Sequence, residues 1–125
     1  MTLPSMNVEP ILHEVRHALR RLLETGETSM IDLRAMPLAP GEEEKIRTRL
    51  GTGEVVIQLD AMGPSTLTET AYSGVWWVEH RNPNDVVTGL YIEVAKVPSI
   101  VEPDRQDLID AVARLNDDLE NNDDE

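Results

Sequence analysis

The stretch LDAMGPSTLTETAYSGVWWVEHRN, residues 59–82, decides the fold of this chain, because it contains two expected strands, the turn between them and both tryptophans. Trp76 and Trp77 are adjacent, in a chain that has no phenylalanine and two tyrosines. Neighbouring residues of a strand point to opposite faces of a sheet. We therefore expect Trp77 to fill a core and Trp76 to lie on a more accessible face.

Turn signals divide this stretch and its continuation into strands. Ser73-Gly74 is a two-residue hairpin signal, and Asn82-Pro83-Asn84-Asp85 marks the next turn. Apolar and polar residues alternate before, between and after these turns. The expected strands are residues 54–60, 66–72, 75–81 and 86–97.

The two turns also predict which side chains share a face. A two-residue loop places Thr70 opposite Trp77, and the following turn places Trp77 opposite Leu90. One face then holds an apolar set that we take as core: Val75, Trp77, Leu90, Ile92 and Val94. The other face holds Glu69, Trp76, His80, Tyr91 and Glu93. This second set could form a binding or acid–base site, although a half-covered face with a cross-strand pair of Trp76 and Tyr91 is the simpler interpretation.

Helical spacing of apolar residues appears on both sides of these strands. The first expected helix begins at Pro10 and ends at Gly26, and the second covers residues 41–50, with a short strand at residues 28–34 between them. A third amphipathic helix carries Leu108, Ile109, Val112, Leu115 and Leu119. The order predicts a single α+β domain, a mostly antiparallel four- to five-stranded sheet with three helices packed largely on one face.

Length and charge indicate one acidic domain. The chain has 125 residues and a formal net charge of -13, which disfavours nucleic acid and anionic membranes as partners. Residues 1–9 are expected to be a flexible N-terminus, residues 10–115 the domain and residues 116–125 a disordered acidic tail. Because the sequence has no cysteine, no secretory signal and no apolar run of about 20 residues, the expected location is cytoplasmic.

One motif resembles a catalytic site. His13-Glu14-Val15-Arg16-His17 fits H-E-x-x-H, in which two histidines one helical turn apart bind zinc and the glutamate activates a water. The apolar stripe of this helix centres on Val15 and Leu22, so both histidines should face solvent. No recognisable third ligand follows. We therefore expect no metal, and a minimal zinc-dependent hydrolase using His13, Glu14 and His17 is the enzymatic alternative.

Four stretches together resemble the C-terminal domain of the HupH/HyaF family of hydrogenase expression and formation proteins. They are PILHEVRHALRRLLETGE, MIDLRAMPLAPGEEEKIRTRLGTGEV, LDAMGPSTLTETAYSGVWWVEHRN and LYIEVAKVPSIV. The most specific parts are IDLRAMPL, LGTGEV and GVWWVEHRN. The resemblance covers residues 10–101, most of the chain.

The resemblance implies a non-enzymatic accessory factor or chaperone in the maturation of nickel–iron hydrogenases. Such a factor would bind the precursor of the small, iron–sulfur subunit, other maturation proteins, or both. Without cysteine the chain could not ligate a cluster through thiolates, so it should act by binding protein and without a cofactor. The expected partner-binding residues are Trp76, Tyr91, Glu69, His80 and Glu93. A self-associating structural domain, a homodimer formed through this aromatic face, is a further alternative.

Overall fold

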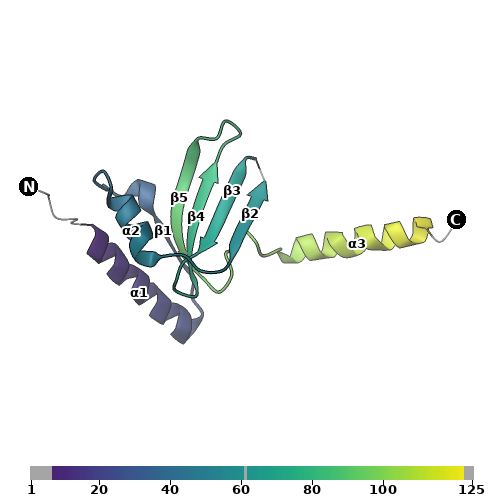
Figure 1. Cartoon of the computed structure of the whole chain (residues 1–125). Helices are drawn as coiled ribbons and strands as arrows, with labels where there is room; N and C mark the ends of the chain where they lie inside the picture. Colours follow the sequence, from purple (N-terminus) through teal and green to yellow (C-terminus); the bar gives the residue numbers. More distant parts are fainter. Residues whose placement is uncertain (1–6, 61, 123–125) are drawn as a thin grey trace, which may run out of the picture.

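The computed structural model describes residues 7–60 and 62–122 and is shown in Figure 1. Helix α1 (Val8–Thr25) buries one apolar stripe: Val8, Ile11, Val15, Ala18 and Leu22. It ends at Gly26, whose left-handed backbone (φ 78°) lets its N–H reach the carbonyl oxygen of Leu22. Because Val8 is buried within α1, the helix begins inside the segment that is predicted to be a flexible N-terminus; residues 1–6 lie outside the described part.

A five-stranded antiparallel sheet forms the centre of the molecule. Its strands are β1 (Ser29–Asp32), β2 (Val56–Asp60), β3 (Pro64–Glu69), β4 (Val75–Arg81) and β5 (Val87–Val94). Their spatial order is β1-β5-β4-β3-β2, which leaves β1 and β2 at the two edges. The predicted α+β class, with a mostly antiparallel sheet, is confirmed.

Two helices cover one face of this sheet, which we call the inner face (Figure 1). Helix α2 (Glu42–Leu50) contributes Ile46 and Leu50 to the core, together with the α1 stripe and Leu33 of the short 3-10 helix η1 (Leu33–Ala35). The inner face supplies Val75, Trp77, Leu90, Ile92 and Val94. Trp77 is 3% exposed, and the guanidinium of Arg47 lies 5.4 Å from the centre of its ring. The predicted core face is therefore confirmed.

Both central hairpins are offset by two residues from the predicted pairing. Trp77 pairs with Thr68 on β3 and with Ile92 on β5, instead of with Thr70 and Leu90. In the first hairpin, residues 71–74 all belong to the turn. In the second, Arg81 pairs with Val87 instead of Val86, and a β-bulge between residues 80 and 81 adds the second residue of the offset. Since side chains alternate with a period of two, an offset of two leaves each side chain on its predicted face.

The third helix, α3 (Arg105–Asn122), extends away from the sheet (Figure 1). All of its residues are exposed, so the prediction that three helices pack on one face is wrong for α3. Residues 95–101, between β5 and α3, lie over the opposite face of the sheet, and the helix starts after them. α3 also continues to Asn122, past the predicted start of a disordered tail at Asn116; residues 123–125 lie outside the described part. Among the described helices, none is long and apolar enough to span a bilayer.

Candidate functional site

The face of the sheet opposite α1 and α2, which we call the outer face, brings the five predicted partner-binding residues together. The strand register arranges its side chains in three rows that run across the sheet. The first row is Glu69, Trp76 and Glu93; the second is Ile57, Leu67, Val78 and Tyr91; the third is Leu59, Ser65, His80 and Gly89. The predicted face is therefore correct, but its rows differ greatly in accessibility.

The first row is covered by residues 95–101, which we call the crossing segment. The indole Nε1 of Trp76 donates to the carbonyl oxygen of Ala95 (3.1 Å), and the backbone N–H of Ser99 donates to Oε2 of Glu93 (3.0 Å). Val101 packs against the same apolar cluster as Trp76. As a result Trp76 is 5% exposed and Glu93 is 4% exposed. The prediction that Trp76 lies on an accessible face is wrong, because the crossing segment buries it.

The ends of the other two rows remain partly accessible. Tyr91 and His80 are half-buried at one side of the outer face, and Ile57 and Leu59 are half-buried on the edge strand β2. The Tyr91 and His80 rings meet edge to face, with centroids 5.9 Å apart and an interplanar angle of 61°. Together they offer a hydroxyl, an imidazole and apolar surface to a partner.

Gly89 makes this ring pair possible. It lies opposite His80 in the sheet, and a Cβ atom at this position would stand 2.9 Å from Cε2 of Tyr91 and 3.3 Å from Cδ2 of His80. Contacts below 3.0 Å require something to move, so the two rings occupy the space that the absent side chain leaves.

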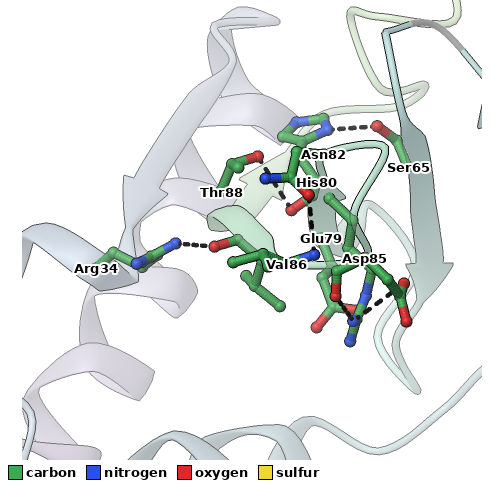
Figure 2. Close-up of polar contacts among 10 residues, drawn as sticks. Arg34, Ser65, Glu79, His80, Asn82, Asp85, Val86 and Thr88 are labelled. Carbon is green, nitrogen blue, oxygen red and sulfur yellow. Dashed lines mark hydrogen bonds and ion pairs between the residues drawn. The ribbon is translucent and has the colours of Figure 1, made fainter.

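His80 is hydrogen-bonded through its imidazole to β3 and through its backbone to β5. Its Nδ1 lies 2.7 Å from Oγ of Ser65, and Oγ1 of Thr88 donates to its carbonyl oxygen (3.3 Å), as Figure 2 shows. Ser65 is only 7% exposed. Within the described residues, no carboxylate is hydrogen-bonded to the other imidazole nitrogen, which is the group that orients a catalytic histidine. The arrangement therefore holds the imidazole of His80 in place on the outer face.

The turn between β4 and β5 supports this side of the outer face (Figure 2). Oδ1 of Asn82 accepts hydrogen bonds from the backbone N–H groups of Asn84 (2.9 Å) and Val86 (3.1 Å). Nη1 of Arg81 donates to the carbonyl oxygen of Asp85 (3.0 Å). The turn signal at residues 82–85 is visible in the sequence, but the bulge that sets the position of His80 is not.

The H-E-x-x-H motif lies on the exposed side of α1. His13 and His17 are both exposed, as predicted, and Nδ1 of His13 is 2.8 Å from Nη2 of Arg16. Over residues 7–60 and 62–122, no group of three or more histidine, aspartate or glutamate side chains is placed to hold a metal ion. The structure does not bring a third ligand to the motif within that part of the chain.

Comparison with known proteins identifies the domain. A family model described as HupH hydrogenase expression protein, C-terminal conserved region, matches residues 5–121. The hydrogenase expression/formation protein HupH of Rhizobium leguminosarum bv. viciae is 27% identical over 113 residues, which are 90% of this chain and 40% of that protein. The hydrogenase expression/formation protein HoxQ of Azotobacter vinelandii is 33% identical over 91 residues, 73% of this chain and 31% of that protein. The chain thus spans less than half the length of either relative.

A solved structure agrees with these matches. The hydrogenase expression protein HupH from Thiobacillus denitrificans superposes with a TM-score of 0.87 at 49% sequence identity. The alignment covers 94% of this chain and 98% of that chain. This chain therefore belongs to the HupH family of hydrogenase expression and formation proteins, and it corresponds to their C-terminal conserved region.

Proposed function

We propose that this protein is a non-enzymatic accessory factor of nickel–iron hydrogenase maturation that binds the precursor of the small, iron–sulfur subunit. Membership of a family named for hydrogenase expression and formation supports the process. The outer face supports a binding role, because it presents half-buried aromatic and apolar side chains on a rigid sheet.

The half-buried pair of Tyr91 and His80 is the observation that carries this proposal. Partly exposed aromatic rings are frequent anchors of protein interfaces. The two rings of this pair contact each other in the space beside Gly89, which has no side chain. Ile57 and Leu59 extend the apolar surface toward the free edge of β2. An extended apolar segment of the client would fit across these rows.

The remaining predicted residues take different roles in the proposal. Trp76 and Glu93 are buried and hold the crossing segment, so they fix the border of the site on the same face. Glu69 is half-buried at the rim, and the net charge of -13 would speed association with a basic client segment. A chaperone must release its client, so we propose an affinity on the order of micromolar.

Complementation of a gene deletion tests the function in the cell. We expect the deletion strain to lose hydrogenase activity and to accumulate unprocessed small subunit, and the wild-type gene to reverse both effects. Tyr91→Ala should complement poorly, whereas Tyr72→Ala, which removes the other tyrosine at a 53% exposed turn position, should complement fully. Normal hydrogenase activity in the deletion strain would contradict the proposed function.

A further inference from the structure

Helix α3 has an apolar stripe with no partner among the described residues. Its 18 residues carry Leu108, Val112, Leu115 and Leu119 at intervals of four, three and four, and each of these side chains is 55–62% exposed. Most of the stability of helices in proteins comes from packing of an apolar face rather than from the helix alone. An apolar stripe of this kind is the mark of a helix that packs against another surface.

A matching surface lies on the exposed side of α1. Two adjoining grooves of about 350 and 510 Å³ share Arg16 and Leu19 in their linings. Leu12 lines the first groove and Leu23, which is 86% exposed, lines the second. Leu12 and Leu23 are separated by about 17 Å of helix, as are Leu108 and Leu119, so the α3 stripe is long enough to contact both leucines of the α1 groove.

The charges beside these two apolar surfaces are complementary. Arg16, Arg20 and Lys96 line the α1 groove, in a chain whose net charge is -13. α3 carries five acidic residues and two arginines. At about 100° per residue, Asp107 and Asp118 flank its apolar stripe on one side, and Arg105 lies nearer to the stripe than Glu120 on the other. The flank that carries Asp107 and Asp118 can therefore face the cations of the groove.

We propose that α3 of one molecule docks in the α1 groove of a second copy, and that the exchange is reciprocal, giving a two-fold symmetric dimer. The α1 groove of the same molecule is unfavourably placed for α3. α1 covers the inner face, whereas the crossing segment carries the chain over the outer face before α3 begins (Figure 1). The dimer uses neither Tyr91 nor His80, so it is independent of the proposed client site.

Single-cysteine cross-linking tests the identity of the occupant, since the natural chain has no cysteine. A tagged Leu23→Cys chain is mixed with an untagged Leu108→Cys chain, and separately with an untagged Leu119→Cys chain, and oxidised. A mixed disulfide dimer should form in one of the two mixtures. The mixture that cross-links shows whether α3 runs parallel or antiparallel to α1 of the second copy. The proposal is overturned if the α3 variants cross-link only with themselves, or if a Leu23→Cys/Leu108→Cys or Leu23→Cys/Leu119→Cys double variant cross-links only within one chain.

Sedimentation equilibrium gives an independent test. Wild type should be dimeric in the micromolar range, and Leu23→Asp and Leu115→Asp should each weaken the dimer at least tenfold. Val86→Asp is a matched control, because Val86 is 56% exposed on the distant β4–β5 turn, and it should leave the dimer intact. A monomeric wild type, or equal loss of dimer in all three variants with unchanged circular dichroism, would contradict the proposal.

Discussion

The indole Nε1 of Trp76 donates a hydrogen bond to the carbonyl oxygen of Ala95 across 3.1 Å, and this bond ties the crossing segment to the outer face of the sheet. Nearby, Glu93 accepts a hydrogen bond from the backbone N–H of Ser99. The two contacts hold the crossing segment against the outer face ahead of α3. Trp76 is thus a structural anchor for the crossing segment, beside the accessible residues of the candidate site.

Trp76→Ala should lower the free energy of unfolding by about 3–5 kcal/mol, because it empties a buried volume in the outer apolar cluster. Trp76→Phe keeps most of that volume and loses the hydrogen bond to Ala95, so it should cost less. Urea unfolding of both variants measures the difference. A loss below about 1 kcal/mol for Trp76→Ala would show that the crossing segment does not bury this ring in solution.

Gly89→Ala should weaken client binding while changing the stability of the fold only slightly. The new Cβ would push on the Tyr91 and His80 rings, whose half-buried ends can move, so unfolding should change by no more than about 1 kcal/mol. The ring pair would be displaced, and client binding should weaken. Nuclear magnetic resonance shifts of the two rings check the displacement; unchanged shifts would show that the close approach at Gly89 does not constrain them.

Side-chain alternation was enough to predict the two faces of the sheet, but not the pairing of its strands. Val75 and Trp77 are on the core face as expected, since an error of two residues changes no face. The true turn includes Ala71 and Tyr72, which carry no turn signal, and is closed by a hydrogen bond from the Thr70 N–H to the carbonyl oxygen of Val75 (3.0 Å). Local sequence does not reveal how far a strand continues into its turn.

Local sequence patterns also do not predict that residues 95–101 cover the outer face. Residues 95–101 have no periodicity that would indicate which surface they cross, so the burial of Trp76 could not be foreseen. The stripe on α3 predicted a helix that needs a partner, and the helix is present. A pattern of apolar residues indicates that a helix face packs against something, but it does not identify the element or molecule that packs there. Of the five predicted site residues, only Tyr91, His80 and Glu69 are partly accessible.

Glu42 should make stability depend on pH in the acidic range. Its carboxylate accepts hydrogen bonds from the backbone N–H of Ala39 (2.6 Å) and from the backbone and side-chain N–H groups of Asn7 (3.0 and 3.1 Å). These donors lower the pKa of Glu42 below its ordinary value of 4.5. A folded-state pKa below the unfolded one stabilises the fold above pH 4.5, and this contribution is lost as the pH falls through the folded-state pKa.

Glu42→Gln should therefore destabilise the protein at neutral pH, and the difference from wild type should shrink as the pH drops below 4.5. Urea unfolding of both proteins across this range measures the effect. Glu43→Gln, at the neighbouring exposed position, is the control and should show no such trend. A constant difference between Glu42→Gln and wild type at all pH values would mean that the charge of Glu42 is not involved.

The H-E-x-x-H motif should prove dispensable for folding and metal content. His13→Ala and His17→Ala should each change the free energy of unfolding by less than about 0.5 kcal/mol, as exposed substitutions usually do. Metal analysis should give the same zinc content for wild type and both variants. Stoichiometric zinc in wild type that disappears in either variant would support a metal site at this motif.

Isothermal titration of the purified protein with the purified precursor of a nickel–iron hydrogenase small subunit tests the central claim most directly. We expect binding with a dissociation constant on the order of micromolar, about -8 kcal/mol, no chemical change in the precursor, and at least tenfold weaker binding by Tyr91→Ala than by Tyr72→Ala. Equal binding by the two tyrosine variants would move the site elsewhere on the surface, and the absence of any binding by wild type would contradict the account.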